Sequence, residues 1–228
     1  MEVRTATFSD SQPISNLLLT ALSSEPQWQY LFPDRHAHTS AHASRINSVV
    51  AHCLNSPTDW TITIAEDPKT KTPLSVAVWS TCTPGAEPSP TAYTDILSSC
   101  GPEDGTKPSH AAAYLAAISR GREKYFTGFG PRLHLYLIAT HPRQQGRGYA
   151  QALVAWGLKK AAEQKVAAST LVSAKGYVFF SGLGFKDVGL MQVVGEGEEG
   201  REELVVKVMV NTSGRDRRPS VLRFLGLE

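Results

Sequence analysis

The sequence predicts an α/β protein in which a mixed, twisted β-sheet is flanked by helices. Short runs of β-forming residues alternate with stretches whose apolar residues recur at helical spacing. A β-prone run from Leu133 to Thr140 leads into a turn rich in glycine and arginine, and then into an amphipathic stretch. A chain of 228 residues with 41% apolar content is long enough to bury one substantial core, and its length allows one domain or two small ones.

The first part of the chain predicts the element order β-α-α-β-β. The run Val3 to Phe8 is rich in β-forming residues. Capping residues and Pro13 then favour the start of a helix, whose apolar stripe consists of Ile14, Leu17, Leu18 and Ala21. A second helix is expected over 40–54. Two strands, 60–65 and 74–82, are expected to pair across a polar turn at 67–72.

The last part of the chain predicts further alternation of helix and strand. Tyr149, Leu153 and Trp156 recur at helical spacing. A short buried strand, a short helix and two further strands are then expected over 168–174, 175–183, 185–194 and 202–210. An acidic, glycine-rich loop at 195–200 would join the last two strands as a hairpin.

Composition and charge exclude several classes of function. A net charge of +2 and a pI near 8.4 are too mild to indicate nucleic-acid binding. The cysteines Cys53, Cys82 and Cys100 show no Cys-x-x-Cys spacing, so we expect neither a disulfide framework nor a zinc site. No signal peptide is recognised after Met1, and no apolar run approaches membrane length. We therefore expect a cytoplasmic protein that binds no metal, nucleic acid or membrane.

The turn that follows Thr140 has the composition of a phosphate-binding loop, Arg143-Gln144-Gln145-Gly146-Arg147-Gly148. A turn between a strand and a helix presents backbone N–H groups at the positive end of the helix, and glycines allow a phosphate to approach them closely. A Walker loop would need Gly-x-x-x-x-Gly-Lys-Ser/Thr, which is missing, and a Rossmann turn would need a third glycine where Gln151 stands. A surface turn with chance glycines is the remaining alternative.

Two landmarks of the sequence resemble the GNAT superfamily of acyl-CoA N-acyltransferases. The turn fits the superfamily signature Arg/Gln-x-x-Gly-x-Gly/Ala, and the run Gly176 to Phe185 resembles a second landmark, Gly-x-x-x-Tyr-x-x-x-Gly-Phe. The resemblance covers 133–210 well and the N-terminal part loosely. It implies a single GNAT domain over 1–210, a tail over 211–228, and a V-shaped opening where the fourth and fifth strands splay apart.

The resemblance also implies acetyl-CoA as co-substrate. The coenzyme pyrophosphate would bind the glycine-rich turn and the start of the next helix, and the pantetheine arm would lie along the fourth strand like an added strand. The cofactor-binding residues that this implies are Ile138, Ala139, Thr140, Arg143, Gln144, Gln145, Gly146, Arg147, Gly148, Tyr149, Ala150 and Phe180.

The segment 83–130 lies where the superfamily usually passes directly from its third strand to its fourth. Thr83 to Thr106 is rich in Pro, Gly, Ser and Thr, and His110 to Tyr125 predicts a helix. The segment is interpreted either as a mobile insertion or as a lid over the acceptor site. We favour the lid, because long ordered loops beside a catalytic strand usually carry function.

His134 is the predicted catalytic base. Attack of an amine on a thioester needs a neutral amine, and strand alternation places His134, Tyr136, Ile138 and Thr140 on one face of the fourth strand. Histidine titrates closest to neutrality, so it would act directly or through water. The resemblance supports this choice, since family members carry glutamate or histidine at this position, and one type carries a second histidine where this chain has Tyr136. A hydrogen-bonded core histidine is the structural alternative.

Phe180 departs from the family pattern. The family tyrosine that protonates the leaving thiolate matches Phe180, which has no hydroxyl. Tyr177 or Ser181 on the same short segment would substitute for it. The alternative is a chain that performs another reaction, or binds coenzyme A without acyl transfer.

The implied function is transfer of an acetyl group from acetyl-CoA to a primary amine of a small molecule. Direct attack in a ternary complex is expected, because no cysteine is placed as a nucleophile. Trp28, Tyr30, Phe32 and Trp79 are predicted as an aromatic wall for the amine, although core packing explains Trp79 equally well. The alternatives are a protein or peptide lysine or N-terminal acetyltransferase, and a repurposed GNAT domain that binds coenzyme A or a biosynthetic intermediate. The chain would be a monomer or a homodimer.

Overall fold

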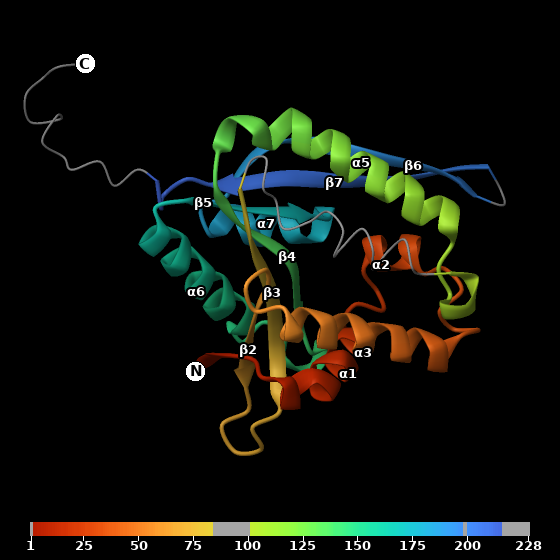
Figure 1. Cartoon of the computed structure of the whole chain (residues 1–228), viewed down its shortest axis with the longest axis horizontal. Helices are drawn as coiled ribbons and strands as arrows, with labels where there is room; N and C mark the ends of the chain where they lie inside the picture. Colours follow the sequence, from red (N-terminus) through yellow and green to blue (C-terminus); the bar gives the residue numbers. More distant parts are fainter. Residues whose placement is uncertain (1, 84–100, 198–199, 216–228) are drawn as a thin grey trace, which may run out of the picture.

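The computed structural model describes residues 2–83, 101–197 and 200–215, which form one α/β fold around a seven-stranded sheet (Figure 1). The strand order is β1-β2-β3-β4-β5-β7-β6. The pair β4–β5 is parallel, and all the other neighbouring pairs are antiparallel. The strands are β1 Val3–Thr5, β2 Thr61–Glu66, β3 Pro73–Cys82, β4 Arg132–Thr140, β5 Ala167–Val172, β6 Lys186–Gly197 and β7 Gly200–Asn211. The predicted α/β class with a mixed sheet is confirmed.

Helices cover both faces of this sheet. They are α1 Ser11–Ala21, α2 Pro26–Leu31, α3 Thr39–Asn55, α5 Pro108–Phe126, α6 Tyr149–Gln164 and α7 Ala174–Gly182, with 3-10 turns at Phe8–Asp10, Pro102–Asp104, Thr127–Phe129 and Pro142–Gln144. Alternation along β2 and β3 sends Ile62 and Val76 into the core beneath α1 and α3. The neighbouring Ala77 and Trp79 point to the opposite face, where they pack against Leu153 of α6.

The helix α5 is an integral part of the core. It runs along β6 and β7 in Figure 1, and its buried Tyr114 and Ile118 pack with Met191 and Val206 of those strands. The helix predicted over 110–125 is therefore present, and it supports the sheet on the face that α1 and α3 also cover. Residues 84–100 of the expected insertion lie outside the described residues.

The other differences from the sequence prediction lie at the two ends of the chain. The first strand is shorter than expected because Phe8 already begins a 3-10 turn, and α2 forms a separate short helix opened by Pro26. At the far end, β7 continues to Asn211, and Gly214 lies so close to Val166 and Ala161 that a side chain would not fit there. The start of the predicted tail is thus packed against the domain. Residues 216–228 lie outside the described part.

Candidate active site

The sheet opens at one point, midway along β4. The parallel ladder between β4 and β5 runs from Arg132↔Ala167 to Leu135↔Thr170 and stops there, although β4 continues to Thr140. Thr170 closes the end of the ladder by donating from Oγ1 to the Leu135 carbonyl over 3.1 Å. Beyond this point the two strands separate, which is the opening expected between the fourth and fifth strands.

A β-bulge at Tyr136 marks this opening. On the other edge of β4, Val78 pairs with Leu137 and Trp79 pairs with Leu135, so Tyr136 is an extra residue without an opposite partner. The extra residue reverses the alternation of the side chains that follow. Leu137 consequently shares the α1–α3 side of the sheet with Tyr136.

The expected alternation along β4 is therefore wrong beyond the bulge. The prediction placed Ile138 and Thr140 on the same face as His134 and Tyr136. In the structure, Ile138 packs with Leu135 and the α6 core, on the opposite face from Tyr136. Side chains alternate between the two faces of a strand only while its pairing is regular, and a single extra residue moves every later side chain to the other face.

A cleft of about 650 Å³ runs through the opening. One end is lined by the turn after β4 and by the start of α6. The middle is lined by the separated ends of β4 and β5 and by α7, and the other end by side chains of α1, α2 and α3. Most of the α1–α3 side chains are apolar: Leu18, Leu22, Trp28, Leu31, Phe32, Ile46 and Val49. The arrangement joins a polar, glycine-rich end to a largely apolar end within one continuous space.

The glycine-rich turn has the geometry of an anion site. Gly146 and Gly148 have positive φ angles of 75° and 83°, and a Cβ atom added to either glycine would meet no atom within 4 Å. Gly148 is the N-cap of α6, so the N–H groups of Tyr149 and Ala150 lie in the first turn, where the helix itself offers no acceptors. These amides and the helix dipole favour a negatively charged group at this end of the cleft.

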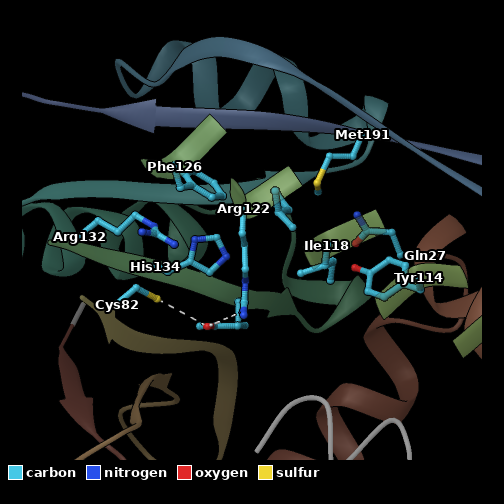
Figure 2. Close-up of a pocket in the computed structure, with 11 residues that line it drawn as sticks. Gln27, Cys82, Tyr114, Ile118, Arg122, Phe126, Arg132, His134 and Met191 are labelled. Atoms are coloured by element: carbon cyan, nitrogen blue, oxygen red, sulfur yellow. Dashed lines mark hydrogen bonds between the residues drawn. The ribbon is translucent and has the colours of Figure 1, made fainter. Parts of the chain in front are cut away.

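His134 lies in a second, smaller pocket beside the cleft. The pocket measures about 30 Å³ and shares Gln27, Tyr114, Tyr136 and Leu171 with the cleft lining. Figure 2 shows His134 between the side chains of Arg132 and Arg122. The His134 ring meets the Tyr136 ring edge-on, with centroids 4.6 Å apart, and its Nδ1 lies 2.7 Å from Ser169 Oγ. A volume of this size holds about two water molecules.

The surroundings of His134 keep its ring neutral. Burial lowers the pKa of His134 well below its ordinary value of 6.5, and the positive charges of Arg132 and Arg122 lower it further. If Nδ1–H donates to Ser169 Oγ, the lone pair lies on Nε2, which makes Nε2 the proton acceptor. The Tyr136 hydroxyl accepts a 3.2 Å hydrogen bond from Arg122 Nη2 and lies 3.6 Å from Cys82 Sγ.

The cleft brings together most of the residues predicted to bind the cofactor. Those that line it are Ile138, Thr140, Gln144, Gln145, Gly146, Gly148, Tyr149, Ala150 and Phe180. Ala139 is buried under α1 and α3, and the side chains of Arg143 and Arg147 are exposed outside the lining. Tyr136 also lines the cleft, and so do Trp28 and Phe32 from the predicted aromatic wall.

Three further predicted site residues lie outside the cleft. Trp79 is fully buried against Gly157 of α6, so core packing explains it. The Tyr30 ring is buried and stacks on His110, with centroids 4.2 Å apart. Tyr177 lies on the exposed side of α7, with Lys207 Nζ 5.6 Å from its ring centroid. The two tyrosines and Trp79 are thus placed by contacts that local sequence does not reveal.

The structure adds polar residues to the cleft that the sequence did not single out. Glu25 and Lys175 both line it, although they are 150 residues apart. Gln27 lines the cleft and the small pocket, and its buried Nε2 has no hydrogen-bond partner among the described residues. The sequence contains little that could have identified these residues. Glu25 and Gln27 stand close to Trp28 in the chain, but such proximity does not by itself indicate a site.

Metal-binding clusters and membrane-spanning helices are both missing from the described residues. No group of three or more His, Cys, Asp or Glu side chains in 2–83, 101–197 and 200–215 is arranged to hold a metal ion. Within the same ranges, no helix is both long and apolar enough to cross a membrane.

Comparison with known proteins agrees with this geometry. Residues 83–178 match the model of the acetyltransferase (GNAT) family, and no curated protein matches the chain in sequence. Three solved structures illustrate the fold.

The Drosophila melanogaster polyamine N-acetyltransferase, an enzyme that forms N-acetylagmatine, has a TM-score of 0.66 at 12% identity and covers 92% of this chain and 98% of that one. Mosquito arylalkylamine N-acetyltransferase like 5b has a TM-score of 0.62 at 18% identity, with 92% and 98% covered. The PaiA N-acetyltransferase of Thermoplasma acidophilum, in complex with coenzyme A, has a TM-score of 0.50 at 10% identity, with 92% and 97% covered. At these identities the likeness shows the fold, which is the GNAT fold.

Proposed function

The chain combines a GNAT acetyltransferase family match with the GNAT fold, and from this premise we propose that it is an acetyl-CoA-dependent N-acetyltransferase. It moves the acetyl group to a primary amine of a small molecule, by direct attack in a ternary complex. The observation that carries the proposal is the continuous cleft, because it connects a glycine-rich turn suited to a phosphate with a largely apolar end across the separated strands. A two-substrate reaction without a covalent enzyme intermediate needs this arrangement.

The coenzyme occupies the polar end in this proposal. Its pyrophosphate accepts hydrogen bonds from the backbone of Gly146 and Gly148 and from the first turn of α6, and Arg143 and Arg147 add charge from outside the cleft. The pantetheine arm pairs with the edge of β4 beyond Tyr136, where the ladder to β5 has ended. Support comes from the fold shared with a coenzyme A complex.

The acceptor occupies the apolar end. Trp28 and Phe32 offer ring surfaces, and Glu25 offers a negative charge to an ammonium group. The structural neighbours named as arylalkylamine and polyamine acetyltransferases act on small amines, which supports a small-molecule acceptor. The cleft contains one carboxylate among its described lining residues, and a cation with several charges would need more.

His134 serves as the base in this scheme. Bonding to the acetyl carbon makes the attacking nitrogen acidic, and the neutral His134 ring then accepts its proton through water in the small pocket. The C–S bond of the thioester breaks as the amide forms, and coenzyme A leaves as the thiolate. Phe180, at the family acid position, is 3% exposed and has no proton to give. A thiol with a pKa near 8.5 leaves as thiolate at pH 7 at a cost of about 2 kcal/mol, so the reaction proceeds without that acid.

A repurposed, non-catalytic domain is the second candidate, and Phe180 is the observation that favours it. Release of the coenzyme A thiol from acetyl-CoA, measured across a panel of aryl, alkyl and polyamine acceptors and a lysine peptide, separates the candidates. Release with small amines only is expected. Release with the peptide alone would favour a protein acetyltransferase, and coenzyme binding without any release would favour the non-catalytic domain.

The coenzyme site is tested with two variants of one glycine. Gly148→Asp and Gly148→Asn add side chains of almost equal size at a backbone conformation that both residues tolerate. Only the aspartate places a negative charge against the phosphates. Calorimetric titration with acetyl-CoA should show a much larger loss of affinity for Gly148→Asp than for Gly148→Asn. Equal affinities for the two variants would contradict a pyrophosphate site at this turn.

A further inference from the structure

An ion pair spans the cleft between two distant parts of the chain. Lys175, near the start of α7, donates a hydrogen bond from Nζ to the Ser24 carbonyl over 3.1 Å. The same Nζ lies 3.6 Å from Oε1 of Glu25, the N-cap residue of α2. The connection between α1 and α2 is thereby joined to α7 across the opening of the sheet.

The Glu25 carboxylate and the Ser24 carbonyl around Lys175 Nζ would suit any primary ammonium group. A carboxylate supplies charge, and a backbone carbonyl supplies a second hydrogen-bond acceptor for one of the three N–H groups. Glu25 is also the only carboxylate among the described residues that line the cleft, whereas two cationic residues, Arg45 and Lys175, line it. Arg45 is paired with Asp104, at 3.0 Å. The negative charge open to an incoming amine is therefore the one that Lys175 contacts.

We propose that Lys175 is a specificity-determining residue whose ammonium group occupies the position that the ammonium group of the acceptor takes at Glu25 when the acceptor first binds. An incoming amine displaces Lys175 and makes the same two contacts as an ammonium ion. It then gives up one proton to water in the cleft, which frees the nitrogen lone pair that attack on the thioester requires. The inference rests on the acceptor end of the cleft proposed above, and it names the substrate class: amines with one positive charge and an apolar body. A dication brings a second charge into a region where Lys175 and Arg45 are already positive and the described residues contribute no second carboxylate to the wall.

The displacement is energetically easy. The Lys175 side chain is 59% exposed and that of Glu25 is 35% exposed, so the displaced ammonium moves into water. Exposed ion pairs are weak and are screened by salt. Lys175 thus acts as a weak competitor, which shifts the affinity for amines without closing the site.

The test measures amine binding without turnover. Calorimetry with the coenzyme A-loaded protein compares 2-phenylethylamine, a monocation, with 1,4-diaminobutane, a dication. Lys175→Met should bind 2-phenylethylamine roughly two- to five-fold more tightly, the range that exposed ion pairs span. It should bind the diamine with a larger gain, because one repelling charge is gone. Lys175→Arg keeps the charge and should resemble the parent. Lys160→Met, which removes an exposed paired lysine on α6, is the matched control and should change nothing.

A double-mutant cycle assigns the effect to Glu25. In a Glu25→Gln background the Lys175→Met gain for 2-phenylethylamine should vanish, because there is no carboxylate left to release. The inference is overturned if Lys175→Met leaves both affinities unchanged, if the gain for 2-phenylethylamine persists without Glu25, or if neither amine binds any of these proteins. Thiol release from acetyl-CoA is a separate readout. Its absence would count against the proposed acetyl transfer, while the binding cycle would still decide the role of Lys175.

Discussion

We expect the free energy of unfolding to fall in acid because the buried His134 ring is neutral in the folded protein. An exposed histidine would not produce this pH dependence. Burial and the nearby Arg132 and Arg122 hold the pKa of His134 well below 6.5 in the folded state. In the unfolded chain the ring takes up a proton below about pH 6.5. The unfolded state therefore binds more protons in acid, and the free energy of unfolding falls as the pH falls below that value.

The magnitude follows from the single proton involved. Between the unfolded-state pKa and the lower native-state pKa, the free energy of unfolding should fall by about 1.4 kcal/mol for each pH unit. Urea unfolding of the parent and of His134→Gln, from about pH 7.5 to about pH 5.5, measures this directly. Glutamine does not titrate, so the difference in slope between the two proteins belongs to His134.

A second buried histidine provides the control. The pKa of His42 is also lowered, first by burial, and opposed by its hydrogen bond to the Asp104 backbone. His42→Gln should therefore change the slope in the same direction, by a smaller amount. Equal pH slopes for the parent and His134→Gln would refute the reasoning, because His134 would then titrate alike in the folded and unfolded states. It would no longer be the neutral base that the proposed mechanism uses.

Three further outcomes are expected. Phe180→Tyr should leave coenzyme A affinity unchanged and raise turnover or extend activity to higher pH in steady-state assays; an unchanged pH profile would remove the missing-acid interpretation. Gly157→Ala places a methyl group against the Trp79 ring and should cost about 1–3 kcal/mol by urea unfolding; a Trp79→Phe background should recover part of that loss, and full additivity would contradict the contact. Asp104→Ala removes a buried carboxylate that pairs with Arg45 at 3.0 Å and accepts a hydrogen bond from Thr106 at 2.6 Å. The free energy of unfolding should fall by about 1–3 kcal/mol, with a lower urea midpoint. An unchanged midpoint would show that this contact does not hold α3 to the 3-10 turn Pro102–Asp104.

The sequence predicts the features of this molecule that depend on local chemistry. The glycine-rich turn between β4 and α6 is recognisable because strand, glycines and helix are adjacent in the chain, and the structure gives Gly146 and Gly148 the positive φ angles that such a turn uses. The α/β class is predictable for the same reason. The spacing of apolar residues that distinguishes a helix from a strand lies within the sequence of each single element.

The sequence does not predict contacts that form only when distant segments meet. Lys175 reaches Ser24 across 151 residues, and no local pattern relates them. Trp79 appears suitable for an acceptor site until Gly157 is seen to accommodate its ring. The alternation expected along β4 fails at Tyr136 because an unpaired residue leaves no mark in composition. Each of these errors has one cause: the partner that decides the outcome lies elsewhere in the chain.

Because of the bulge at Tyr136, the opening of the sheet depends on the number of residues in β4 more than on which residue stands at this position. Tyr136 is the one residue of this strand with no opposite residue on β3, so replacing its side chain leaves the count of residues, and with it the gap in the sheet, in place. Deleting a single residue here would remove the bulge from the β3–β4 ladder and make the alternation along β4 regular. The edge of β4 that now faces the cleft would then be free to pair with β5 along its whole length. At this position, tolerance to substitution and intolerance to deletion should therefore coexist.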